Sequence, residues 1–82
     1  SMPDVLAENL SDKNVMGSDG TELGIVYNIT MDLKSGELHH LLVDPHEDTP
    51  TRSVSYERDE GGRFRIPVGH VQAVKDYIVV ER

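Results

Sequence analysis

The most regular feature of the chain is an alternation of apolar and polar residues between two glycine turns. The odd-numbered positions of this segment are all apolar, namely Ile25, Tyr27, Ile29, Met31 and Leu33. The residues between them are polar except Val26. A repeat of two is typical of a half-buried strand, here with the odd positions on its covered face. Asp19-Gly20 and Ser35-Gly36 flank the segment, and glycine takes the positive φ that tight hairpins require. The sequence therefore predicts an antiparallel meander of three strands over 15–16, 24–33 and 37–44.

The second half of the chain contains shorter apolar runs. After a loop at 45–52, two strands are expected at 53–57 and 63–68, separated by a turn at 59–62. Their inward side chains are expected to be Val54, Tyr56, Phe64, Ile66 and Val68. A 3₁₀ or strand turn at 70–74 and a last strand at 77–81 complete the chain. Six short strands and no long helix predict an all-β fold, a small antiparallel β-barrel that is closed or partly closed.

The strand expected at 37–44 carries apolar residues on both of its faces. Leu38 and Leu42 lie on one face, and Leu41 and Val43 lie on the other. One face packs into the core, so the other must meet a second layer, a loop or another molecule. Because two-fold pairing is the commonest solution, the sequence predicts a homodimer or pairing with a paralogous barrel. Leu38, Leu42 and Phe64 are the candidates for the apolar centre of that interface.

Length and charge narrow the functional classes. A chain of 82 residues forms one domain, which we place at 10–82, after a lead-in over 1–9 that includes a tag remnant at Ser1. Fifteen acidic residues against eight basic ones give a net charge of −7. This charge repels nucleic acid and anionic lipid, and it suits a high-salt cytoplasm, so a halophilic protein is expected. No signal peptide or membrane span is expected, so we predict a cytoplasmic protein without direct membrane insertion.

The candidate chemical groups do not form a recognisable site. There is no cysteine, and His39 and His40 point to opposite faces of one strand, so they do not ligate one ion together. The carboxylates of Glu57, Asp59 and Glu60 lie beside a Gly-Gly turn, where water keeps them ionised. The sequence thus predicts no catalytic, cofactor-binding or metal-binding residue. Structural roles are instead expected for three glycines: positive φ in turns for Gly20 and Gly36, and a bulge or close backbone approach for Gly24.

Two stretches carry a family resemblance. "VMGSDGTELGIVYNITMDLKSGELHHLLVD" resembles the first half of a PRC-barrel domain, named for the photosynthetic reaction centre H subunit, and "RIPVGHVQAVKDYIVV" resembles its end. The order and spacing of the turns carry the resemblance over roughly residues 10 to 82, and Asn28 and Met31 depart from the family pattern. The acidic composition and short length are similar to those of stand-alone archaeal, haloarchaeal members linked to cell division.

The resemblance implies a non-enzymatic protein-protein interaction module. Its partners would be the SepF-like membrane anchor of the tubulin-like division ring and a paralogous PRC-barrel protein, and such a partner would recruit the chain to the division site. The alternative implied by the resemblance is a barrel associated with ribosome maturation or one that binds a small ligand. The acidic surface argues against direct contact with RNA in that alternative.

Overall fold

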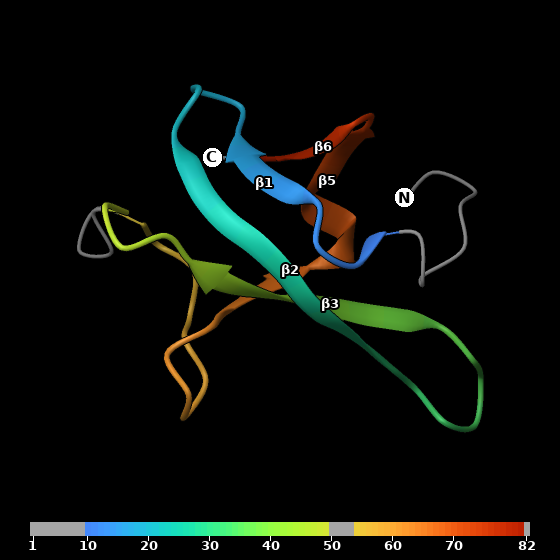
Figure 1. Ribbon diagram of the computed structural model, residues 1–82. Coiled ribbons are helices and arrows are strands. Elements are labelled where there is room, and N and C mark those ends of the chain that lie inside the picture. Colours follow the sequence, from blue (N-terminus) through green and yellow to red (C-terminus); the bar gives the residue numbers. More distant parts are fainter. Residues whose placement is uncertain (1–9, 50–53, 82) are drawn as a thin grey trace.

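The computed structural model describes residues 10–49 and 54–81, and within them six strands form one mixed sheet (Figure 1). The strands are β1 (Asn14–Gly17), β2 (Glu22–Met31), β3 (Leu38–Pro45), β4 (Phe64–Pro67), β5 (Val71–Val74) and β6 (Tyr77–Val80). A 3₁₀ turn, η3 (Val68–His70), lies between β4 and β5. The all-β, six-stranded fold expected from the sequence is confirmed.

The sheet coils because of how its edge strands are connected. Its order is β4-β3-β2-β1-β6-β5, so β4 and β5 are the two outermost strands. Yet β4 and β5 are joined by only the three residues of η3, which span at most about 10 Å. The ends of the sheet are therefore held near each other, as in a partly open barrel. The β1–β6 pair is parallel, whereas the sequence had predicted an antiparallel barrel.

The two tight turns of the first half are held by their own short polar side chains. Gly20 has φ +89° and Gly36 has φ +76°. The side chain of Asp19 accepts a hydrogen bond from the backbone N–H of Thr21, and the side chain of Asp32 accepts one from the N–H of Lys34. These contacts fix the turn before β2 and the turn after it.

The core lies on the concave side of the sheet and draws on every strand. Its buried members are Leu10, Val15, Leu23, Val26, Leu41, Val43, Val54, Phe64, Ile66, Val71, Ile78 and Val80, with Ile29, Tyr56 and Val74 packed against them. These residues are mostly β-branched or leucine, the types that pack well on a pleated surface. The inward positions expected for Val54, Phe64 and Ile66 are confirmed.

The odd positions of β2 do not form one covered face, contrary to the sequence prediction. The strand buries Leu23 and Val26, whereas Ile25, Tyr27 and Met31 are 37%, 53% and 50% exposed. The cause is a bulge, because Val26 pairs with Val43 and Asn28 pairs with Leu42, which leaves Tyr27 as an extra residue. An extra residue exchanges the positions that face the core with those that face solvent. Before the bulge the even-numbered Val26 faces the core, and after it the odd-numbered Ile29 does.

Two strand assignments in the second half were also wrong. Of the segment expected as a strand at 53–57, residue 53 lies outside the described part, and residues 54–57 are not assigned to a strand. The next residue, Arg58, makes only an isolated bridge to Phe64. Conversely, the turn expected at 70–74 contains β5, which pairs with β6 from Val71 to Val74. The number of strands is the same as expected, but β5 takes the place of the strand that was expected at 53–57.

Candidate functional site

The titratable residues singled out in the sequence are dispersed over the fold. Within residues 10–49 and 54–81, no three His, Asp or Glu side chains are placed to hold a metal ion. Asp59 accepts hydrogen bonds from the backbone N–H groups of Gly61 and Arg63, at 2.8 and 3.0 Å, and so stabilises its own turn. Glu57 forms an exposed ion pair with Arg65 at 3.5 Å.

In the described part of the chain, no helix has the length and apolar character needed to cross a bilayer.

The solvent side of β2, β3 and β4, here called the outer face, is the first candidate site. It comprises Ile25, Tyr27, His40, Leu42 and Arg65. Leu42 lies between Asn28 of β2 and Arg65 of β4, and His40 lies between Thr30 and Pro67. Leu42, expected at an interface, is partly exposed here. Leu38 is also partly exposed, but a register shift pairs it with Met31 and so places it on the face opposite His40. The outer face thus presents apolar side chains between polar neighbours.

An aromatic and ionic contact fixes one end of the outer face. The guanidinium carbon of Arg63 lies 3.6 Å from the centroid of the Tyr27 ring. The Nε atom of Arg63 lies 2.8 Å from Oδ1 of Asp44, which makes an ion pair, although the two groups are not aligned as a hydrogen bond. A cation over an aromatic ring is favourable by about 0.5–1 kcal/mol at exposed sites. Tyr27 is therefore held in a defined orientation while about half of it remains exposed.

The imidazole of His40 adds little charge to the outer face at neutral pH. Partial burial is the main reason that its pKa lies below 6.5, and the positive charges of Arg65 and His39 lower it further. The carboxylate of Glu57 opposes the shift. The neutral form is therefore favoured, which keeps this part of the outer face more apolar.

Phe64 is not part of the outer face. It is fully buried and pairs across the sheet with Val43. Of the three residues that the sequence suggested for an interface, Leu42 lies on the outer face, where Ile25 and Tyr27 accompany it. The interface itself stays a prediction. Sequence reasoning missed Ile25 and Tyr27 because a bulge at Tyr27 leaves no distinct signal in an otherwise regular alternation.

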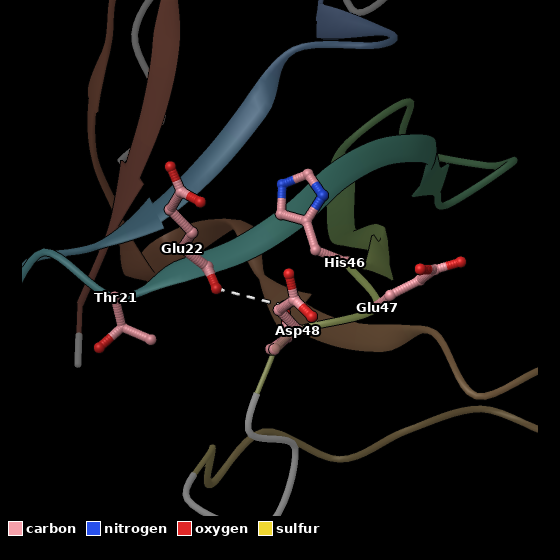
Figure 2. A pocket seen from close by; sticks show the side chains of 6 residues that line it. Thr21, Glu22, His46, Glu47 and Asp48 are labelled. Carbon is pink, nitrogen blue, oxygen red and sulfur yellow. Dashed lines mark hydrogen bonds between the residues drawn. The ribbon is translucent and has the colours of Figure 1, made fainter.

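The second candidate region is a pair of adjoining hollows where β2 begins and β3 ends. One, of about 560 Å³, is lined by Thr21, Glu22, His46, Glu47, Asp48 and Thr49 (Figure 2). The other, of about 300 Å³, is lined by Asn14, Val15, Met16, Glu22, His46 and Tyr77. Glu22 and His46 line both hollows, so the two adjoin. The first is acidic and the second contains three apolar side chains.

Thr49 fixes the loop that forms the acidic hollow. Its buried hydroxyl donates to the carbonyl oxygen of Leu23 at 3.2 Å and lies 3.4 Å from that of Glu22. Its backbone N–H donates to the carbonyl of His46 at 3.0 Å. These bonds attach the segment after β3 to the first residues of β2. In Figure 2 Asp48 lies between Glu22 of β2 and Glu47 of the loop, and the carboxylates of Glu22 and Glu47 point in different directions.

Gly24 brings the same two strands together. It has φ +154°, and a Cβ atom at this position would overlap with the carbonyl oxygen of Asp44. Gly24 pairs with Pro45, the last residue of β3. The close backbone approach expected at Gly24 is therefore present, and it lies next to the hollows.

A third cluster connects the segment before β4 to the end of β6. The hydroxyl of Tyr56 donates to the carbonyl oxygen of Glu81 and lies 3.0 Å from Nδ1 of His70. Since its only proton is already donated, the hydroxyl oxygen accepts from an Nδ1–H of His70. Burial, followed by the charge of Glu81, raises the pKa of Tyr56 above 10.0. This arrangement holds the segment before β4, the 3₁₀ turn and the end of β6 together.

Comparison with known proteins places the chain beside a domain family and an archaeal protein. Residues 2–82 match the PRC-barrel domain family. The chain is also similar to an uncharacterized protein of Methanocaldococcus jannaschii, with 35% identity over 75 residues that cover 92% of this chain and 79% of the relative. The lead-in predicted at 1–9 lies outside the described residues, so the boundary at residue 10 stays a prediction.

Proposed function

The chain belongs to the PRC-barrel domain family, and from this premise we propose that it is a non-enzymatic module that binds another protein through its outer face. The observation that carries the proposal is the exposure of Ile25 and Tyr27 beside the partly exposed Leu42. Apolar side chains that cluster on the surface of a small acidic protein are more favourable when a partner covers them than when they contact water. Tyrosine is also enriched among residues that dominate binding energy.

The orientation of Tyr27 supports the same role. Because Arg63 stacks on the ring and pairs with Asp44, Tyr27 loses little conformational freedom when a partner covers it. Leu42 lies one ladder position away, opposite Asn28. A preorganised aromatic ring beside a partly exposed leucine is suited to anchor a protein interface.

The specific form of the proposal is an archaeal cell-division adaptor. Its partners would be a SepF-like membrane anchor and a paralogous PRC-barrel protein, and a homodimer would use the same outer face. The family resemblance, the acidic composition and the similar archaeal protein support this form. Under this proposal the chain is cytoplasmic and reaches the division site through its partner.

The test is a binding titration between the purified chain and the purified SepF-like anchor from the same organism. Tyr27→Ser and Leu42→Ser should each weaken binding about tenfold or more, because they remove anchors from the centre of the interface. Gln72→Ser is the matched control, since Gln72 is exposed on β5, at the other end of the sheet order. Wild-type affinity in both outer-face variants would exclude the outer face as the binding surface. No binding of the unmodified chain would exclude the anchor as its partner.

The larger hollow has the size of a small-molecule site, which bears on the alternative of a small-ligand-binding or ribosome-maturation barrel. A volume of about 560 Å³ falls in the range of small-molecule sites, about 300–1,000 Å³. Its acidic lining, however, lacks the predominantly apolar walls of such sites. Copurification from native cells distinguishes the two proposed functions. Division proteins among the copurified proteins support the adaptor, and ribosome assembly factors support the alternative.

A further inference from the structure

The turn between β2 and β3 presents one leucine almost completely to solvent. Leu33 is 94% exposed at this turn. The turn itself is held by Asp32, whose Oδ1 accepts from the backbone N–H groups of Lys34 and Ser35 at 2.7 and 3.0 Å. Its N–H also donates to the carbonyl of Glu37 at 2.8 Å. The exposed leucine is therefore carried by an ordered turn, which lowers the entropic cost of burying it in a partner.

Lys34, the next residue, adds a positive charge to this tip. It is one of only three lysines in a chain with a net charge of −7. Lys34 is exposed, and across residues 10–49 and 54–81 its ammonium group takes part in none of the ion pairs. The tip thus combines an apolar side chain and a free cation on adjacent residues.

The two hollows at the other end of the hairpin have the complementary chemistry, in the same adjacent arrangement. The smaller hollow, about 300 Å³, is lined by Val15, Met16 and Tyr77 and offers apolar contact to a leucine side chain. The larger hollow joins it through Glu22 and His46 and adds the carboxylates of Glu47 and Asp48. A neighbouring leucine and lysine therefore match a neighbouring apolar hollow and acidic hollow.

The tip and the hollows of one molecule lie too far apart to meet. Glu22 is the first residue of β2 and Met31 is the last. Ten residues of strand span about 30 Å, which is close to the longest dimension of the molecule, 35 Å. Figure 1 shows the turn before β2 and the turn after it at opposite ends of this strand. Any contact between the tip and the hollows must therefore join two molecules.

We propose that the chain self-associates head to tail, with Leu33 of one copy in the hollow lined by Met16 and Tyr77 of the next copy. Lys34 then lies against the carboxylates of Glu22, Glu47 and Asp48 in the adjoining hollow. The two surfaces in contact are different, so each pair keeps one free tip and one free hollow, and such a contact extends into a chain or closes into a ring. This contact is separate from the outer face proposed above for binding a partner.

The contact is weak. A two-residue tip covers much less than the roughly 1,200 Å² of total surface at the lower limit of stable interfaces. We expect dissociation constants of about 0.1–1 mM for the isolated chain, so self-association should appear only at high protein concentration. A membrane anchor that binds the outer face would raise the local concentration and favour the same contact.

The test mixes two variants that are each defective in one half of the contact. Leu33→Ser removes the tip and keeps the hollow, whereas Tyr77→Ser alters the hollow and keeps the tip. In binding titrations, Leu33→Ser with itself and Tyr77→Ser with itself should bind about tenfold or more weaker than the unmodified chain. A mixture of the two should regain one intact contact and form 1:1 pairs. Symmetric pairing through the outer face would contribute equally to all three titrations, so it does not mimic this result.

A second hollow variant guards against an effect of Tyr77→Ser on folding. Glu47 is exposed in the loop after β3, so Glu47→Lys should leave the fold intact, weaken self-association of the variant and still allow binding of its tip to Leu33→Ser. Circular dichroism spectra identical to that of the unmodified chain are required for each variant. The proposal is overturned if the mixed titration binds no better than the two homotypic ones, or if the unmodified chain stays monomeric at about 1 mM.

Discussion

The two halves of the β2–β3 hairpin have different neighbours and therefore different roles. Near its start, β2 lies between β1 and β3 and buries Leu23 and Val26. Beyond Val26, among the described residues, β2 pairs with β3 alone, and Met31 is half exposed. One continuous strand thus stabilises the core at one end and extends into solvent at the other. Its apolar residues cannot be assigned to core or surface by residue type alone.

The same substitution at the two ends should separate these roles most clearly. Leu23→Ala removes a fully buried side chain and should lower the free energy of unfolding by about 2–5 kcal/mol. Leu33→Ala changes an almost fully exposed side chain and should stay within about 0.5 kcal/mol. Urea denaturation followed by circular dichroism measures both values. Equal losses in the two variants would show that the tip is packed in solution and would remove the contrast.

Glycine substitutions offer a second matched pair, with a smaller expected difference. Gly24→Ala places a Cβ atom onto the carbonyl of Asp44, so the strands must separate, and we expect a loss of roughly 2–3 kcal/mol. Gly36→Ala meets no atom within 4 Å and costs only the strain of φ +76°, about 1 kcal/mol. Melting temperatures of both variants, measured side by side, decide the order. A Gly36 variant that melts below the Gly24 variant would contradict the close approach of β2 and β3.

The contrast between the two ends also explains what the sequence could predict. Strand content and turn positions follow from local chemistry, so the alternation and the Asp19-Gly20 and Ser35-Gly36 turns correctly located β2 and β3. The side of the sheet on which a residue lies depends on bulges. The bulge at Tyr27 comes from pairing with β3, which no local sequence pattern records. The parallel β1–β6 pair is likewise a long-range contact, between residues more than 60 positions apart. Sequence reasoning therefore missed the strand topology and the side of the sheet on which residues of β2 lie.

The candidate sites follow the same division. Leu38 and Leu42 were proposed from apolar residues on both faces of one strand, a local signal. Both are partly exposed, but the register shift beside His39 leaves Leu42 on the outer face and places Leu38 on the opposite face. Phe64 was assigned to the interface without such a signal, and the structure places it in the core. The hollows depend on the pairing of Gly24 with Pro45, which brings Glu22 next to the loop at His46. A site formed by residues distant in sequence needed the three-dimensional register to become visible.

Salt should affect the whole molecule more evenly than any of these substitutions. With a net charge of −7 on 82 residues, repulsion between carboxylates opposes folding at low ionic strength. In 1 M KCl the screening length falls to about 3 Å, so this repulsion nearly disappears. We expect the melting temperature to rise between dilute buffer and molar KCl for the unmodified chain and for Leu33→Ala alike. An unchanged melting temperature would contradict the prediction of a salt-adapted protein.

The smallest expected effect is a pH dependence that comes from the outer face. The folded chain disfavours protonated His40 because of partial burial and the charges of Arg65 and His39, so its pKa lies below the 6.5 of the unfolded chain. Between these two pKa values the unfolded chain binds more protons than the folded one. The stability contributed by neutral His40 is therefore present above pH 6.5 and declines as the pH falls toward the folded pKa. His40→Gln should reduce the loss of stability between pH 7.5 and pH 5.5, measured by urea denaturation. His46→Gln is the control, because it removes an imidazole that is not among the groups that shift the pKa of His40. If His40→Gln loses as much stability as the unmodified chain over this range, the acid sensitivity arises elsewhere, and the outer face does not favour a neutral imidazole.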